Sequence, residues 1–354
     1  MDLCHLVLQG GPGLVQIAVT NACNARCRFC NFSRVPSDAV SMADPRRLAR
    51  GLASLRKRGS HYITFTGGEP LLYPHLLPSL ARAGELGHHT ILVTNGALLS
   101  PPLIRELREA GLDCLIISLD AASPERHDQH RGIPGLTAHI QEMLAFANLS
   151  GLSPIASVTV SRLIDDFDEL LRSLQKLGFE RLTFSYPLTQ LRSSYLGYAS
   201  HDSVAYSARE LDNLFRRIIA LKSRAPLKVL NSRQALVDLK NGLQGRPRRF
   251  PCLAGFKHFF VDWDLKVYRC HFLEQILGPF EEIHLAPHFR DGCDACTSEC
   301  YRDASVFQYA ALSLSDFLEA WRRGQWLKGL RTLLHPYNAL SLADLLASRH
   351  WLSH

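Results

Sequence analysis

Three cysteines at short spacings, Cys23, Cys27 and Cys30, carry the strongest chemical signal in the sequence. The spacing is CxxxCxxC, and it follows an apolar run at 14–19 that predicts a β-strand. Three thiolates on one short loop can hold three corners of a four-iron cluster, which is normally bound by four cysteines. The fourth iron would then remain open for chemistry. A structural zinc site is the alternative, but it needs a fourth cysteine or histidine nearby, and the next cysteine is Cys114.

A second motif, Gly67-Gly68-Glu69-Pro70, directly follows a predicted strand at 62–66. Two glycines let the backbone approach a ligand closely, without side chains in the way. Glu69 offers a carboxylate to an ammonium group. Alone, these four residues would indicate only a turn. Their position after a strand and downstream of the cysteines makes a ligand-binding turn the more specific interpretation.

The cysteine triplet resembles that of the radical S-adenosylmethionine (SAM) enzymes. In that family the open iron binds the amino and carboxylate groups of SAM, and one electron cleaves the sulfonium to release a 5′-deoxyadenosyl radical. The resemblance implies that Phe29, just before the third cysteine, shields the cluster and packs near SAM. It also implies that the motif of Gly67, Gly68, Glu69 and Pro70 holds the amino group of SAM. An electron donor such as flavodoxin or ferredoxin is implied as a partner.

Polar residues also end the next two predicted strands, and they extend the predicted cofactor site to Thr94, Asn95, Ser118 and Asp120. The stretch from Ser118 to Arg131 resembles the fourth-strand region of molybdenum-cofactor cyclases and peptide-modifying maturases. This resemblance implies that Ser118 contacts the SAM ribose. Arg131 is expected to pair with the SAM carboxylate or to order the loop. The alternative for Arg131 is a surface arginine that caps a helix.

A second group of cysteines follows a linker at 245–249 and comprises Cys252, Cys270, Cys293, Cys296 and Cys300. Five cysteines so close together are hard to explain as core packing, although cysteine can pack as a small hydrophobe. Two apolar runs around 262–266 predict a β-hairpin between the first two of them.

This region resembles the auxiliary-cluster extensions called SPASM and twitch. The resemblance implies one auxiliary four-iron cluster held by Cys252, Cys270 and two of Cys293, Cys296 and Cys300, which leaves the fifth cysteine unexplained. The family usually has glycine in the hairpin turn where this chain has Leu265. A four-cysteine zinc knuckle is the alternative. Cys4 and Cys114 are expected to be ordinary thiols.

The elements that must position these residues alternate between strand and helix. Strands are predicted at 14–19, 62–66, 90–94, 115–119, 155–160 and 181–186, and helices at 45–58, 74–86, 101–110, 135–150 and 165–177. Continuous apolar strands are typical of a parallel sheet buried on both faces, and right-handed crossovers curl such a sheet. Six units are too few for an eight-stranded barrel. We therefore expect an α/β fold, a partial (β/α)6 TIM-like barrel whose site lies at the carboxyl ends of the strands.

Three domains are predicted along the chain. Residues 1–245 form the barrel together with helices at 207–224 and 231–243, residues 246–305 form the small cysteine-rich domain, and residues 306–354 form a helical tail. In the tail, apolar residues recur at helical spacing around Trp321 and Trp326, with Arg322, Arg323, Lys328 and Arg331 among them. We expect this face to pack on the barrel or on the auxiliary domain. A basic amphipathic helix with tryptophan can alternatively lie on an anionic bilayer, which would suit a lipid-like substrate.

Composition narrows the class of protein. The chain has 354 residues, of which 46% are hydrophobic and 21% charged, as in soluble globular proteins. The N-terminus is a poor signal peptide, and ten cysteines at cluster-like spacings fit a reducing cytoplasm. The net charge of +7 comes from scattered basic groups, which indicate a solvated surface or an anionic substrate. No nucleic-acid-binding signature is present, so no nucleic-acid partner is expected.

The sequence predicts an enzyme but does not identify its substrate. The implied radical would abstract hydrogen from a small-molecule or lipid-like substrate, leading to oxidation, epimerisation or bond formation. A molybdenum-cofactor cyclase is not favoured, because the chain lacks a Gly-Arg-Gly-Gly-type tail. Peptide substrates are less expected, since only about a dozen residues precede the first strand. The rivals are a non-catalytic iron–sulfur electron carrier and a zinc-stabilised binding module.

Overall fold

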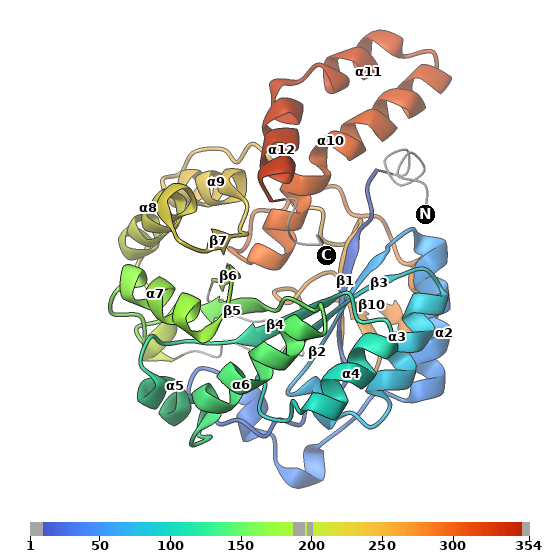
Figure 1. The fold of residues 1–354 in the computed structure, drawn as a ribbon. Helices are drawn as coiled ribbons and strands as arrows, with labels where there is room; N and C mark the ends of the chain where they lie inside the picture. The colour runs from blue at the N-terminus through green and yellow to red at the C-terminus, as the bar shows by residue number, and fades with distance from the viewer. Residues whose placement is uncertain (1–9, 187–194, 197–200, 349–354) are drawn as a thin grey trace.

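One sheet of ten strands organises the protein. The structure, a computed structural model, describes residues 10–186, 195–196 and 201–348, and its strand order is β10-β9-β8-β1-β2-β3-β4-β5-β6-β7 (Figure 1). The strands are β1 (Leu14–Ala18), β2 (Tyr62–Thr66), β3 (His89–Thr94), β4 (Cys114–Ser118), β5 (Ile155–Thr159), β6 (Arg181–Ser185), β7 (Lys228–Val229), β8 (His258–Val261), β9 (Lys266–Tyr268) and β10 (Ile276–Pro279).

Strands β1 to β7 are parallel and follow chain order, so the predicted partial barrel is confirmed. The helices that cover its outer face are α2 (Pro45–Arg58), α3 (Leu76–Glu85), α4 (Pro101–Glu109), α5 (Pro124–Arg131), α6 (Leu136–Leu149) and α7 (Phe167–Leu177). Short 3-10 turns are η1 (Asn31–Arg34), η2 (Ser37–Ala39), η3 (Pro70–Leu72), η4 (Asp202–Val204) and η5 (Phe280–Leu285). The predicted bounds agree closely because side-chain caps mark the helix starts, as Asp44 does for α2 and Ser100 for α4.

The sheet extends beyond the six predicted strands on both sides. The two-residue strand β7 follows α8 (Ala208–Arg224) and pairs with β6. On the other side, β8 pairs in parallel with β1, so the cysteine-rich segment continues the barrel sheet. The division of the chain at 245 and 305 stays a prediction.

The predicted hairpin is present, and its turn is built without glycine. Strands β8 and β9 are antiparallel, and Leu265 between them has a φ of 61° while its side chain is 1% exposed. Oδ1 of Asp262 accepts the backbone N–H groups of Asp264 and Lys266, at 3.1 and 2.9 Å. These bonds and the burial of the leucine side chain explain how the turn tolerates the left-handed conformation that glycine usually supplies.

The two faces of the barrel strands differ in chemistry. Side chains on alternate positions, such as Ile17, Phe65 and Leu115, pack outward in the main core with the helices. The inward positions begin with an apolar floor of Ile91, Cys114, Ile116, Ile155 and Leu230. Towards the carboxyl ends the same faces carry Gln16, Thr64, Ser118, Ser157, Thr159, Thr183 and Ser185, as register and alternation show. The interior of the barrel is therefore apolar at its base and rich in hydroxyl groups near the carboxyl ends of the strands.

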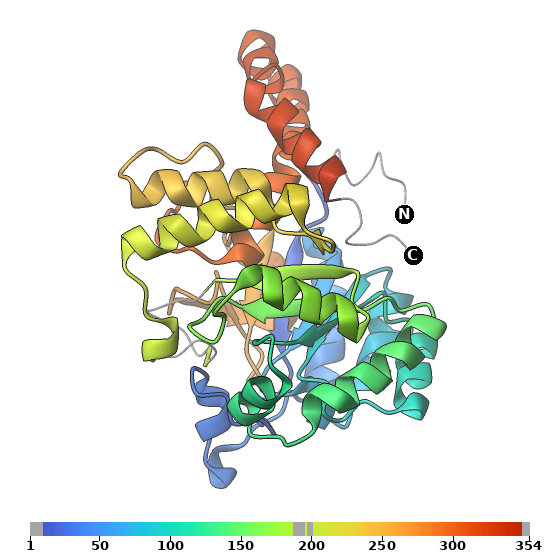
Figure 2. The same cartoon turned by 60° about the vertical axis from the view of Figure 1, so that its left-hand side comes forward.

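The C-terminal region is helical, as predicted. It contains α9 (Arg233–Leu243), α10 (Glu299–Arg322), α11 (Trp326–Leu333) and α12 (Pro336–Ala347). Helix α12 packs on α9 and α10, and Asp344 accepts the backbone N–H groups of Arg233 and Gln234 at the start of α9, at 3.1 and 3.0 Å. Figures 1 and 2 show the α10–α11 hairpin projecting from the body, at the end opposite the blue 31–39 segment. No helix in the described ranges is both long and apolar enough to cross a membrane.

Candidate active site

The first cysteine loop gathers its three thiols beside the carboxyl end of β1. Cys27 is buried, and Cys23 and Cys30 are partly buried. Burial is the main cause that raises the pKa of Cys23 to about 11 and of Cys30 to about 12, and the neighbouring thiolates raise both further. These pKa values favour protonated thiols near neutral pH, so binding as thiolates would require positive charge from the bound group. This donor set therefore fits an iron–sulfur cluster, which binds cysteine as thiolate.

Arg131 supplies positive charge to this loop. Its side chain is 9% exposed, so the surface-arginine alternative is wrong, and its Nη2 lies 2.5 Å from Oδ2 of Asp120. The carbonyl of Arg131 accepts the N–H of Arg26 at 2.7 Å, which orders the cysteine loop. Burial raises the pKa of Cys27, while the guanidinium of Arg131 opposes that rise. Its Nε is buried and has no hydrogen-bond partner among the residues that the structure describes.

Asp120 contacts the protein rather than an open site. It is fully buried, its Oδ1 accepts the N–H of Thr159 at 3.3 Å, and its own N–H donates to Nδ1 of His127 at 3.1 Å. Burial disfavours the charged carboxylate, but Arg131 and the two histidines His127 and His130 outweigh it and hold the pKa of Asp120 below its usual value. Asp120 therefore positions Arg131.

The two glycines of the second motif lie against the cysteine loop. A Cβ on Gly67 would stand 2.3 Å from the carbonyl oxygen of Thr20, and one on Gly68 would stand 2.0 Å from that of Ala22. The N–H groups of Gly68 and Glu69 donate to the same two carbonyls, at 2.9 and 2.7 Å. The sequence predicted close approach to a ligand; the structure shows that the close approach is to the backbone that precedes Cys23.

The carboxylate of Glu69 ties this turn to the end of β3. Glu69 is 1% exposed and accepts from the N–H of Leu71 at 3.0 Å, the hydroxyl of Thr94 at 2.7 Å and the N–H of Asn95 at 2.8 Å. The expectation of a carboxylate free for an ammonium group is therefore corrected, because its oxygens already serve protein donors. Asn95 in turn donates to Asn24 in the cysteine loop at 2.7 Å, and Pro70 is buried at the start of η3.

Phe29 is buried in the first cysteine loop, and Ser118 lies at the end of β4. The ring of Phe29 is buried beside Cys27, and its centroid is 4.6 Å from that of His130. Ser118, at the end of β4, is in register with Ser157 and faces the hydroxyl-rich interior of the barrel.

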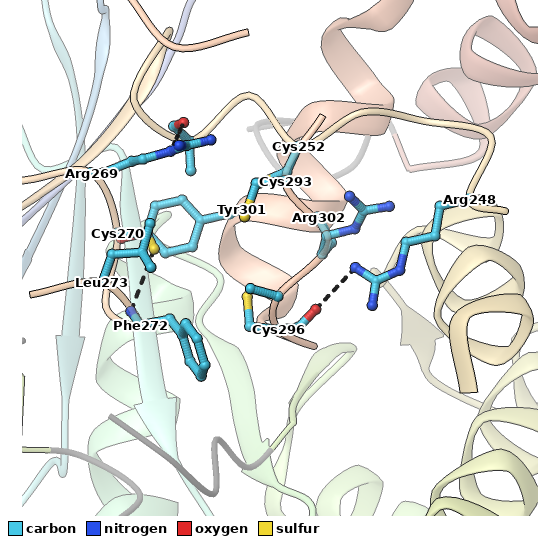
Figure 3. A pocket seen from close by; sticks show the side chains of 12 residues that line it. Arg248, Cys252, Arg269, Cys270, Phe272, Leu273, Cys293, Cys296, Tyr301 and Arg302 are labelled. Carbon is cyan, nitrogen blue, oxygen red and sulfur yellow. Dashed lines mark hydrogen bonds between the residues drawn. The ribbon is translucent and has the colours of Figure 1, made fainter. Parts of the chain in front are cut away.

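Four cysteines line a separate pocket beyond β9 (Figure 3). Cys252, Cys270, Cys293 and Cys296 line this small pocket together with Arg248, Arg269 and Arg302. Cys300 is not among the lining residues; its thiol donates to Oε1 of Glu299 at 3.3 Å. The sequence left open which two of the last three cysteines join Cys252 and Cys270, and the geometry favours Cys293 and Cys296.

The pocket is built for negatively charged sulfur. Burial raises the pKa of Cys270 to about 11 and of Cys296 to about 12, whereas backbone N–H groups directed at their sulfurs oppose the rise. One of these is the N–H of Phe272, 3.4 Å from Sγ of Cys270. Arg302 is almost fully buried and lowers the pKa of Cys252 against the effect of burial. In the described parts of the chain, no three thiol, imidazole or carboxylate groups are close enough to hold a single metal ion.

Sequence reasoning missed Glu299, which joins this pocket to the barrel. Glu299 is buried, and its Oε2 accepts the N–H of Tyr186 at the end of β6, at 3.1 Å. Burial raises the pKa of Glu299 and that of Cys300, whose thiolate Gln16 of β1 would stabilise by a hydrogen bond. A single glutamate has no motif spacing that would identify it from the sequence. The only available signal was its position three residues after the second cysteine of a CxxC pair.

A chain of aromatic rings connects the two cysteine regions. Tyr195 lies 5.9 Å from Phe32, which follows Cys30, and 3.9 Å from His271, which follows Cys270, measured between ring centroids. The neighbouring carbonyl of Leu196 accepts the N–H of Asn31 at 2.9 Å. This segment therefore bridges the first loop and the second pocket. Cys4 lies outside the described residues, whereas Cys114 is an apolar floor residue, as expected.

Comparison with known proteins gives one family and several relatives. Residues 17–160 match the model of the radical SAM superfamily. An AdoMet-dependent heme synthase of Methanosarcina barkeri is 29% identical over 52% of this chain and 49% of that enzyme. The heme synthase of Oleidesulfovibrio alaskensis is 24% identical over 78% of this chain and 75% of the enzyme. A GTP 3′,8-cyclase of Synechococcus is 38% identical over 40% of this chain and 41% of the enzyme. The chain thus spans half or less of two of these three relatives.

Two solved structures share the fold. The structure described as native anSMEcpe with bound AdoMet has a TM-score of 0.57 and 17% identity, covering 93% of this chain and 100% of that chain. Streptococcus suis SuiB bound to S-adenosylmethionine has a TM-score of 0.58 and 14% identity, covering 76% of this chain and 64% of that chain.

Proposed function

We propose that this chain, which belongs to the radical SAM superfamily and is a radical SAM enzyme, acts on a polar small molecule held between its two cysteine regions. The observation that carries the proposal is the joint packing of three thiols, the Gly67–Glu69 turn and Arg131 at the carboxyl ends of the strands. An iron–sulfur electron carrier would have no use for the turn or for the buried guanidinium.

The first loop would hold a four-iron cluster through Cys23, Cys27 and Cys30. With SAM bound, that cluster supplies the electron that generates the 5′-deoxyadenosyl radical, an implication of the family resemblance. Phe29, buried beside Cys27, keeps water from the thiols. The hydrogen bonds of Gly68 and Glu69 to the backbone before Cys23 fix the loop before any ligand arrives.

The same residues give SAM its orientation in this proposal. The Gly67–Glu69 turn faces the methionine amino group, with Glu69 acting as a positioning residue through Thr94 and Asn95. Arg131, whose Nε has no partner in the described part of the chain, takes the carboxylate. Ser118, at the hydroxyl-rich face of β4, contacts the ribose.

The second pocket would hold an auxiliary four-iron cluster through Cys252, Cys270, Cys293 and Cys296. Arg248, Arg269 and Arg302 offset its negative charge. In this place it would accept an electron from the substrate or hold the substrate in position. Cys300 would be a thiol outside the ligand set, held with Glu299 near Gln16 of the barrel.

The space between the two regions favours a polar substrate. Hydroxyl side chains such as Thr64, Ser157 and Thr183 line the inward face of the strands, and Glu299 stands at its edge. The curated relatives include a heme synthase and a GTP cyclase. A hydrogen abstraction that leads to oxidation or bond formation fits this site. A flavodoxin or ferredoxin of the cytoplasm would supply the electron.

Anaerobic reconstitution tests the proposal. The intact chain should bind about eight irons if both sites hold a four-iron cluster, and with dithionite and SAM it should form 5′-deoxyadenosine. Cys27→Ala should lose about half of the iron and all cleavage, whereas Cys114→Val, a control in the apolar floor, should lose neither. Zinc without iron would identify a zinc-stabilised module, and iron without 5′-deoxyadenosine would identify an electron carrier.

A further inference from the structure

Helix α11 and the end of α10 expose a stripe of large apolar side chains. Trp321 is 61% exposed, Trp326 57%, Leu327 58% and Leu334 72%. Trp326, Leu330 and Leu334 follow one another at a spacing of four residues, so they share one face of the helix, and Leu327 borders it. A water-facing stripe of this size on a short helix needs a partner.

The stripe is exposed because α11 packs on α10 through the neighbouring side of the helix, which contains Gly329. Gly329 is the buried residue of α11, and a Cβ placed on it would lie 3.1 Å from Phe317 and from Ala320 of α10. The glycine thus allows the two helices to approach closely and turns the tryptophan and leucines outward. The expectation that this face packs on the barrel or the auxiliary domain is wrong for α11, while α12 supplies the packing of the tail.

Positive charge accompanies the stripe. Lys328 and Arg331 are exposed on α11, which carries no acidic residue, and Arg322 and Arg323 precede it. Among these four, Arg323 is neutralised by Glu319 in the preceding turn. Lys328, Arg331 and His335 also line a groove with Leu327, Tyr309 and Thr332. An apolar stripe bordered by basic side chains is complementary to a surface that offers acyl chains beneath anionic headgroups.

We propose that the α11 face binds peripherally to an anionic lipid bilayer, with Trp321 and Trp326 at the headgroup level. The charge of the face argues against a second copy as the occupant. A two-fold interface would bring Lys328 and Arg331 of one copy against the same residues of the other, with no acid on α11 to compensate. The phosphates of an anionic bilayer would instead attract the positive charges of Lys328 and Arg331.

The position of the α11 face in the fold determines how the enzyme would be oriented on the bilayer. The α10–α11 hairpin and the 31–39 segment next to the first cysteine loop lie at opposite ends of the molecule (Figure 2). Contact through α11 would therefore leave the carboxyl ends of the strands directed away from the lipid. It anchors the enzyme at the surface and does not present lipid to the site, so this inference does not depend on the proposed function.

Vesicle flotation of the reconstituted full-length protein tests the inference. It should float with vesicles of phosphatidylcholine and phosphatidylglycerol at low salt and remain in solution with phosphatidylcholine alone. Lys328→Gln with Arg331→Gln should weaken partitioning by roughly 10- to 30-fold, since each basic residue at an anionic surface contributes a factor of about five. Arg46→Gln with Lys57→Gln on α2 removes the same charge from exposed positions elsewhere and should leave partitioning unchanged.

Trp326→Ser tests the apolar half of the contact and should also reduce flotation, with iron content and circular dichroism unchanged because the ring is exposed. Equal flotation of both double variants would overturn the proposal. So would flotation of the intact protein that does not respond to the lipid charge. A sedimentation coefficient that shows a dimer, and falls to that of a monomer in Trp326→Ser, would assign the face to self-association instead.

Discussion

The ring of Tyr195 lies flat against the imidazole of His271, with centroids 3.9 Å apart and an angle of 5° between the planes. Tyr195 belongs to the segment that holds Asn31 beside the first cysteine loop, and His271 is next to Cys270 of the second pocket. One stacked pair thus connects two cysteine regions that come from distant parts of the sequence.

The stack gives the first prediction. His271→Ala should lower the thermal midpoint, because it leaves a cavity and removes an aromatic pair that is worth about 0.5–1.5 kcal/mol beyond its buried area. His271→Phe keeps a flat ring and should recover most of the loss. The measurement is thermal unfolding by circular dichroism on protein of equal iron content. Equal midpoints for the two variants would show that the stacked ring contributes nothing.

The second prediction concerns Gly68. In Gly68→Ala the new Cβ would stand 2.0 Å from the carbonyl oxygen of Ala22, so the turn must move away from the cysteine loop. We expect loss of the first cluster, seen as about four irons per chain instead of eight, and no 5′-deoxyadenosine. Gly84→Ala in α3 is the matched control, because nothing lies within 4 Å of its added Cβ. It should keep all iron and, as a helix substitution, raise stability by up to about 1 kcal/mol. Full iron in Gly68→Ala would contradict the packing argument.

The ligand assignment gives the third prediction. Cys293→Ser should lose about four irons per chain and the signal of the second cluster. Cys300→Ser should keep both clusters, because its thiol bonds to Glu299 and does not line the pocket. Iron analysis and electron paramagnetic resonance of the reduced proteins distinguish the two. Loss of iron in Cys300→Ser, with Cys293→Ser intact, would reverse the assignment.

The sequence predicted the elements of the barrel more completely than the roles of the site residues. Strand and helix positions followed from apolar runs, which are local patterns, and the structure shows that side-chain caps such as Asp44 and Ser100 begin the helices there. The pairing of β8 with β1 is a contact across more than two hundred residues, and no local pattern records it. For the same reason, the spacing rules found the cysteines but could not separate Cys300 from Cys293 and Cys296, because the difference lies in which neighbours surround each thiol.

The roles of individual site residues depended on packing that residue type does not reveal. The sequence predicted that Glu69, after two glycines, binds an ammonium group. In the structure its carboxylate oxygens accept hydrogen bonds from Leu71, Thr94 and Asn95. The sequence left a buried ligand-binding role and a surface cap open for Arg131, and its burial against Asp120 excludes the surface cap. In both cases the buried charge contacts residues that lie at or just beyond the carboxyl ends of the barrel strands.

The fourth prediction concerns the hairpin turn at Leu265. A non-glycine residue in the left-handed region costs about 1–2 kcal/mol, and Leu265→Gly would remove that cost. The substitution would also remove a buried leucine from the core, which typically costs about 2–5 kcal/mol. The second effect is larger, so Leu265→Gly should lower the urea midpoint even though relatives of this fold are expected to have glycine there. A raised midpoint would show that backbone strain dominates.

The last prediction uses His258, which joins β8 to β1. Its Nδ1 accepts the N–H of Leu14 at 3.1 Å, and its Nε2 lies 3.4 Å from the side-chain amide of Gln308. Burial, with a smaller contribution from Lys257, lowers the pKa of His258 to about 3 from an ordinary value of 6.5. Between pH 6.5 and 3 the unfolded chain therefore binds a proton that the folded chain does not, and folding stability falls as the pH falls through this window. The loss from this residue should reach about 1 kcal/mol at pH 5.5.

His258→Asn retains an acceptor for Leu14 but does not titrate, so its urea midpoint should fall less than that of the unaltered protein between pH 7.5 and 5.5. The other buried histidines contribute equally to both proteins and cancel in the comparison. Identical pH dependence would mean that His258 is protonated in the folded protein or neutral in both states, and the prediction would fail.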